Sequence, residues 1–189
     1  MAKLLLEQGY AAVSYRALAA KAGVTPSLVQ YYFPSLDSLF VAMIRRLIEG
    51  DVERWTEALL KRPDEPLRVL WEYSASEAAG ALSMELMALG NHRPELRAEL
   101  SEGTQRIRKL QLDAVKAKYG ADAFLDERFS ADAMVLLLTS MPKYLSLEDG
   151  IMVKMGHKPL VAAFVNYLDS VEPKAKRRKA TARRSTPKT

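Results

Sequence analysis

Apolar side chains recur at the spacing of an α-helix along almost the whole chain, and this periodicity limits the fold more than any other feature. Leu39, Met43 and Leu47 follow one another at intervals of four residues, and the same stripe returns between residues 107 and 115. The alternation typical of strands is almost absent, and no Asn-Gly or Asp-Gly turn separates two β-branched runs. The sequence therefore predicts an all-α fold of about nine helices.

Helix-starting and helix-breaking residues divide this pattern into segments. Ser14 and Thr25 are typical N-cap residues, and Gly23 suits a left-handed helix end. Phe33-Pro34 ends one helix, because the residue before a proline avoids helical geometry. We expect helices over residues 1–8, 15–22, 26–33, 35–60, 66–79, 81–90, 94–119, 130–146 and 157–170, with a weak point at Gly50, a break at Gly80 and a kink or split at Pro142.

Charged residues are unevenly distributed along the chain, which has a net charge of +5. Residues 172–189 contain eight basic residues and one acid, so the remainder is slightly negative. Within that remainder, residues 1–46 contain five basic residues and two acids. This asymmetry predicts contact with a polyanion near the N-terminus. The basic tail has no apolar stripe and is expected to be disordered; it either binds phosphates or is solvated without a role.

Absent residue types argue against several classes of protein. Without cysteine, the chain has no disulfide, thiol nucleophile or thiolate metal site. Its two histidines, His92 and His157, have no carboxylates at ligand spacing. We therefore expect no metal, no cofactor, no catalytic residues and no enzymatic activity. The longest strongly apolar run, residues 134–138, is too short to cross a membrane, so we expect a cytoplasmic protein without membrane contact.

Residues 18–33 have the form of a helix-turn-helix motif. Leu18-Ala19-x-x-Ala22-Gly23-Val24-Thr25 joins two short helices through a tight turn, and Ala19 must be small because the helices cross there. Such a motif places its second helix in the major groove of DNA. We assign Leu18, Val24, Leu28, Val29 and Phe33 to the inner face, which leaves Ser27, Gln30, Tyr31 and Tyr32 facing outward.

The run GYAAVSYRALAAKAGVTPSLVQYYFPSLDSL resembles the DNA-binding segment of the TetR/AcrR family of bacterial transcriptional repressors, over about residues 4–47. The resemblance implies a DNA-binding domain over residues 1–34 and a ligand-binding and dimerisation domain over 35–171, followed by the basic tail of 172–189. By position, it implies that DNA is contacted by Ser14, Tyr15, Arg16, Thr25, Ser27, Gln30, Tyr31 and Tyr32.

This segment departs from the family pattern in three places. Pro26 replaces the usual basic residue after the cap, Ser27 replaces the usual glycine or proline, and Leu36 replaces a common lysine. The first helix has only two turns where the family has about four. Either residues are missing before Met1, which we favour, or this chain anchors its head less firmly. An alternative is a helical interaction module with a degenerate helix-turn-helix that no longer binds DNA.

The resemblance also implies a small-molecule pocket in the middle of the chain, for an effector that is largely apolar. The candidate lining residues are Trp55, Trp71, Tyr73, Met84, Met87 and His92, although core packing is the simpler interpretation for each one taken alone. Residues 134–138 and 160–165 are apolar nearly all round, which favours burial against a second copy of the chain through the last two helices. We therefore expect a homodimeric, ligand-responsive regulator, most simply a repressor of a near-palindromic operator.

Overall fold

The computed structural model describes residues 1–75, 77–120 and 129–173, and these residues are almost entirely helical, which confirms the all-α prediction. No β-strand occurs among them. In chain order their elements are α1 (Ala2–Gln8), the 3₁₀ helix η1 (Tyr10–Ala12), α2 (Tyr15–Ala22), α3 (Pro26–Tyr32), α4 (Leu36–Lys61), α5 (Pro66–Ser74), α6 (Glu77–Gly90), α7 (Pro94–Tyr119), α8 (Ala131–Gly150) and α9 (His157–Val171).

Side-chain caps begin α2, α3 and α4 where the sequence predicted them. Ser14 Oγ accepts from the backbone N–H of Ala17 at 3.2 Å, and Thr25 Oγ1 accepts from Leu28 at 3.3 Å. At α4, Ser35 and Ser38 exchange hydrogen bonds between side chain and backbone. Each cap satisfies backbone donors that have no partner within the helix, which fixes where these three helices start.

Three predicted boundaries are wrong. The helix expected over residues 66–79 ends at Ser74, and α6 continues through Gly80, where a break was predicted. Helix α8 is not split at Pro142 and extends to Gly150. Because α6 packs on α7 and α8, and α8 packs on α5, tertiary contacts outweigh the low helix propensity of glycine and proline.

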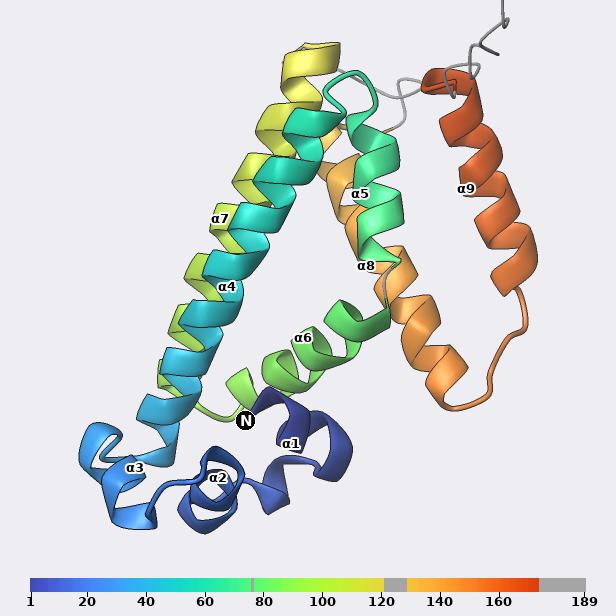
Figure 1. Ribbon diagram of the computed structural model, residues 1–189. Coiled ribbons are helices and arrows are strands. Elements are labelled where there is room, and N and C mark those ends of the chain that lie inside the picture. Colours follow the sequence, from blue (N-terminus) through green and yellow to red (C-terminus); the bar gives the residue numbers. More distant parts are fainter. Residues whose placement is uncertain (76, 121–128, 174–189) are drawn as a thin grey trace, which may run out of the picture.

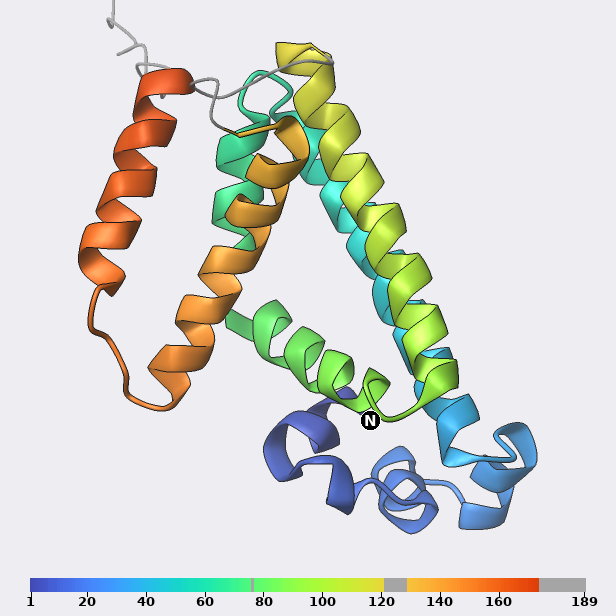
Figure 2. The same ribbon diagram turned by 180° about the vertical axis from the view of Figure 1, so that it is seen from behind.

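A small head made of α1, α2 and α3 lies at one end of the molecule (Figure 1). Helix α4 leaves this head and runs beside α7 along most of its length. Helix α6 crosses between the head and the α5–α8 pair, and α1 packs against it. Helix α9 stands at the opposite edge, next to α5 and α8, as the view from behind also shows (Figure 2). No helix in the described ranges is both long and apolar enough to traverse a membrane.

Two hydrophobic clusters hold the fold together, and one of them joins the head to the rest of the chain. That cluster combines Leu5 of α1 and Leu18 of α2 with Phe40 of α4, Leu86 of α6 and Leu96 of α7. The second cluster lies between α4, α5, α7, α8 and the end of α9. Because the head shares its core with α6 and α7, it is not attached through α4 alone.

Helix α7 packs closely against Ile48 of α4 at Gly103. A Cβ atom built on Gly103 would lie 2.6 Å from Cγ1 of Ile48, and nearer still to its Cδ1. Any larger residue at position 103 would therefore have to displace the Ile48 side chain from this closely packed contact.

The end of α9 is tied to the start of α5 by Glu172. This residue was assigned to the basic tail, but it is only 3% exposed and accepts from the backbone N–H groups of Leu67 and Arg68. Arg68 in turn donates to Asp169 at 2.8 Å and to the Glu172 carbonyl at 2.6 Å. Glu172 is thus part of the folded body, and the remainder of the predicted tail, from residue 174, lies outside the described residues.

Candidate DNA-binding surface and effector cavity

Helices α2 and α3 are joined by a tight turn that follows the predicted helix-turn-helix geometry. Gly23 adopts a left-handed conformation with φ of 69°, and the N–H of Val24 donates to the Ala19 carbonyl at 3.1 Å. Ala19 is fully buried, in agreement with the requirement for a small residue where the helices meet. Val29 and Phe33 on α3 and its C-cap pack against the same cluster as Leu18.

Two residues assigned to the inner face do not lie there. Val24 is 39% exposed and Leu28 is 45% exposed. Helix α3 has only seven residues, and Val29 and its C-cap Phe33 are the side chains that pack it against the core of the head. The head therefore presents apolar as well as polar side chains to solvent near the turn.

The outer face of α3 has the arrangement that the sequence predicted. Tyr31 is 79% exposed and Tyr32 is 68% exposed, and their rings meet edge to face with centroids 5.3 Å apart. Gln30, Thr25 and Ser27 are also exposed, and the two hydroxyls of Thr25 and Ser27 lie 3.1 Å apart. Hydroxyl and amide groups on an exposed helix can reach both base edges and phosphates.

The three residues at the start of α2 have different environments. Ser14 is the N-cap and Arg16 is exposed, without an ion-pair partner among the described side chains. Tyr15, however, donates its hydroxyl hydrogen to the Phe33 carbonyl at 2.8 Å. Its hydroxyl proton is engaged within the head, so Tyr15 holds the end of α3 in place and is not free to donate to a phosphate.

A cluster around Arg93 connects the head to the α6–α7 turn, and the sequence reasoning did not find it. The Arg93 guanidinium donates to the Asp37 carboxylate and to the Tyr10 hydroxyl, and its carbon lies 4.7 Å from the centroid of the Tyr10 ring. Tyr10 stacks on Phe40 at 5.5 Å. No local pattern predicts this cluster, because Arg93 is more than 50 residues from both partners.

A cavity of about 950 Å³ opens between α4, α5, α6, α7 and α8. Of the predicted lining residues, Trp55, Tyr73, Met84 and Met87 do line it, and the rings of Trp55 and Tyr73 lie 4.7 Å apart. Trp71 stacks on Phe164 of α9 at 5.1 Å and belongs to the core. His92 is exposed in the α6–α7 turn and is not among the lining residues, so these two lie outside the cavity.

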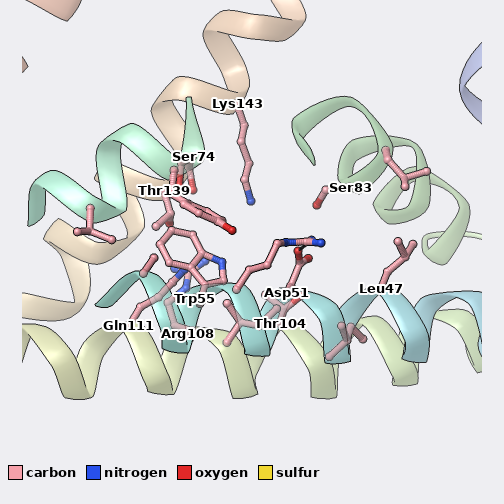
Figure 3. Close-up of a pocket in the computed structure, with 18 of the residues that line it drawn as sticks. Leu47, Asp51, Trp55, Ser74, Ser83, Thr104, Arg108, Gln111, Thr139 and Lys143 are labelled. Atoms are coloured by element: carbon pink, nitrogen blue, oxygen red, sulfur yellow. Dashed lines mark hydrogen bonds and ion pairs between the residues drawn. The ribbon is translucent and has the colours of Figure 1, made fainter. Parts of the chain in front are cut away.

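Polar side chains enter the cavity from α7 and α8, and the sequence reasoning missed them (Figure 3). Gln111 and Thr139 are buried, and the Thr139 hydroxyl donates to the Val135 carbonyl at 2.7 Å. Lys143 extends from α8 into the space between the helices. A signal was present, since Thr139 and Lys143 are four residues apart and therefore share one face of an otherwise apolar helix.

Burial lowers the pKa of Lys143 below its ordinary value, because the charged ammonium is favoured less in an apolar surrounding. The nearby Asp51 carboxylate acts in the opposite direction, and the positive charge of Arg108 lowers the pKa further. Within the part of the chain that the structure describes, no group of three or more histidine and acidic side chains is close enough to hold a metal ion.

Comparison with known families matches one part of the chain. Residues 2–43 fit the family model described as bacterial regulatory proteins, tetR family. This range contains α1, α2, α3 and the first part of α4, and hence the whole exposed face described above. A comparison with curated proteins gave no significant match.

Proposed function

We propose that this chain, whose residues 2–43 fit the TetR family model, is a DNA-binding transcriptional regulator, and specifically a homodimeric repressor released from its operator by a small effector. The observation that carries this proposal is that two helices, α4 and α6, form walls of the cavity and also pack in the core of the head. We further propose that the protein works in the bacterial cytoplasm and catalyses no reaction.

The contact with DNA is assigned to the exposed face of α3 and the start of α2. Tyr31, Tyr32 and Gln30 are the longest side chains on that face, and an amide can read adenine through two hydrogen bonds. Arg16, which is exposed, supplies a positive charge for a phosphate. We assign further contacts with DNA to the shorter side chains of Ser14, Thr25 and Ser27.

Release is assigned to displacement of α6 and α4 by the bound effector. Leu86 of α6 lines the cavity and is also buried in the cluster that contains Leu4 and Leu5 of α1. Ile44 of α4 lines the cavity and belongs to the same cluster. An effector that requires these side chains to move must therefore move the head. The effector can shift the equilibrium between the two head arrangements only as far as it binds the arrangement that cannot engage DNA more tightly than the one that can.

The dimer is assigned to α8 and α9. Within the single chain, α9 buries only Leu168 among its residues, although the helix is largely apolar. Large apolar side chains remain exposed on both helices, namely Leu136, Tyr144, Leu147 and Val161. A second copy related by a two-fold axis would cover these side chains and would place two heads for the halves of a near-palindrome.

A helical interaction module that has lost DNA binding is the competing candidate. Helix α3 contains no basic residue, and Leu36 opens α4 where the family commonly has a lysine. Such a head would retain the fold without the phosphate contacts that supply most of the affinity for DNA.

These two candidates are separated by selecting binding sites from a pool of random duplexes and measuring affinity by gel shift at two salt concentrations. We expect sites with two-fold symmetry and affinity that falls as salt rises. Gln30→Ala and Tyr31→Ala should each weaken binding by about tenfold or more. Gln105→Ala, which changes an exposed glutamine on α7, is the matched control. No enrichment from the pool, or equal effects of Gln30→Ala and Gln105→Ala, would contradict DNA reading by α3.

The dimer is tested separately by sedimentation of Leu136→Glu. A charge at an interface core costs several kcal/mol of association, so we expect this variant to sediment as a monomer. Leu60→Glu places the same charge on a leucine of α4 that is also exposed in the single chain, and this variant should remain a dimer. If both variants sedimented as dimers, the dimer interface would not include Leu136 of α8.

A further inference from the structure

The charges that line the cavity are unbalanced, and the imbalance defines a class of effector. Among the lining residues are three acids and five bases. Three of the bases have a carboxylate partner on the cavity wall: Arg54 pairs with Asp51, Lys61 with Glu57 at 2.5 Å, and Arg62 with Glu72 at 2.6 Å.

The other two bases are Lys143 of α8 and Arg108 of α7, and neither has an ion-pair partner among the described side chains. Lys143 is half-buried and extends toward the middle of the cavity (Figure 3). Burial is the largest influence on Lys143 and lowers its pKa; the Asp51 carboxylate on the cavity wall raises the pKa, and the charge of Arg108 lowers it. Asp51 forms its ion pair with Arg54, so it offsets the charges of Lys143 and Arg108 only in part, and a bound anion would stabilise both cations further.

Hydroxyl groups lie on the same walls. Ser74 Oγ is buried and has no hydrogen-bond partner among the described residues, although a buried hydroxyl without a partner is costly. Ser83 projects from α6 into the same space as Lys143. Thr139 uses its hydroxyl proton on a backbone carbonyl, which leaves its oxygen as an acceptor. These groups can orient a polar end of a ligand next to the two cations.

The remaining wall is apolar and aromatic. Trp55 and Tyr73 form one side, and aliphatic side chains of α4, α6 and α7 form the rest: Ile44, Leu47, Ile48, Leu82, Leu86, Leu100 and Ile107. The volume of about 950 Å³ is at the upper end of the range for small-molecule sites. The cavity thus combines a large apolar part with a small region that has excess positive charge.

We propose that the effector is an amphipathic organic acid, whose carboxylate is bound by Lys143 and Arg108 and whose apolar body lies against Trp55 and Tyr73. This inference rests on the proposed function, since it names the ligand of the same cavity. A carboxylate accepts from an ammonium and a guanidinium through charge-assisted hydrogen bonds, which are stronger than those between neutral groups. A neutral or cationic analogue leaves the two bases uncompensated.

The test uses the tryptophans of the chain, Trp55 and Trp71, as the source of signal. In the Trp71→Phe background the only remaining tryptophan, Trp55, lines the cavity, so its fluorescence reports occupancy directly. The probes are decanoate, 1-decanol and decyltrimethylammonium, which share one alkyl chain and differ in head-group charge, each used below its micelle concentration. We expect decanoate to bind at least about tenfold more tightly than 1-decanol, equivalent to about 1.4 kcal/mol.

Lys143→Met keeps the length of the side chain and removes its charge. We expect this variant to lose most of the preference for decanoate while it keeps its affinity for 1-decanol. Lys109→Met, on the exposed side of α7, is the matched control and should keep the preference. Equal affinity for the acid and the alcohol, tighter binding of the cation, or no binding of decanoate would overturn the proposal.

Failure of this proposal is distinguishable from failure of the proposed function. The gel shift on the ligand-free protein tests DNA recognition without any probe. A chain that selects DNA sites but prefers decyltrimethylammonium remains a regulator with a different effector class. A chain that binds decanoate but selects no DNA site would instead contradict the proposed repressor.

Discussion

Replacing Glu172 tests how much a single buried carboxylate contributes to the attachment of α9. The carboxylate accepts three hydrogen bonds, from Leu67 N–H at 2.9 Å, Arg68 N–H at 2.7 Å and the Tyr119 hydroxyl at 2.8 Å. Its two backbone donors belong to the first turn of α5, where no partner within the helix exists. Glu172 is therefore a cap for α5 supplied from the far end of the chain.

The size of the effect follows from these contacts. Hydrogen bonds to charged groups contribute about 1.5–3 kcal/mol each, but water can enter after truncation and the contributions do not add. At 3% exposure there is little solvent screening, and loss of one partner from a buried charged network costs about 3–5 kcal/mol. We expect Glu172→Ala to lower the free energy of unfolding by this amount, a large part of the typical total of about 5–15 kcal/mol.

The assay is urea unfolding followed by circular dichroism and by tryptophan fluorescence, since Trp71 stacks on Phe164 of α9. Glu53→Ala, at an exposed acid of α4, is the control and should change stability by less than about 0.5 kcal/mol. If the two variants lost equal stability, or if Glu172→Ala lost less than about 1 kcal/mol, the capping role would be refuted. Measurements at two protein concentrations separate this effect from weaker dimerisation.

Three further changes test other parts of the fold. Gly103→Ala should cost about 1–3 kcal/mol through its clash with Ile48, and Ile48→Ala in the same chain should recover part of that loss in a double-mutant cycle of urea unfolding. Arg93→Ala should lower the free energy of unfolding by about 1–2 kcal/mol, because it leaves Asp37 and Tyr10 without this partner, and Arg93→Lys should lose less. Burial and the hydrogen bond to Glu172 raise the pKa of Tyr119, so the unfolded chain releases this proton first; stability should be constant below about pH 10 and fall above it, by at most about 1.4 kcal/mol per pH unit relative to Tyr119→Phe in urea titrations.

The parts of the fold that the sequence predicted are those determined by neighbouring residues. The caps at Ser14, Thr25 and Ser35 depend on a side chain and a backbone group three residues apart, so a short window contains the whole interaction. The outward face of α3 follows in the same way from helical spacing. Such features are predictable because no distant part of the chain has to be placed first.

The features that were missed depend on which helices become neighbours. Gly80 marks a break by propensity, but it lies in a helix that is packed on α7 and α8. Arg93 and Glu172 are unremarkable surface residues in the sequence, and only the fold brings them to Asp37 and Arg68. Trp71 and Trp55 are equally plausible pocket residues until the position of α9 decides that Trp71 is core.

The shared helices also limit how the effector and DNA can influence each other. Ile44 and Leu86 line the cavity and belong to the core of the head, so a ligand that displaces these two side chains also alters the packing of the head. Thermodynamic linkage then makes the influence reciprocal: an effector that weakens DNA binding hundredfold, or about 2.7 kcal/mol, must bind the DNA-bound protein hundredfold more weakly. In the proposed mechanism, an operator-bound dimer therefore has to be a poor receptor for the effector, and release depends on the effector capturing the head arrangement that DNA does not stabilise.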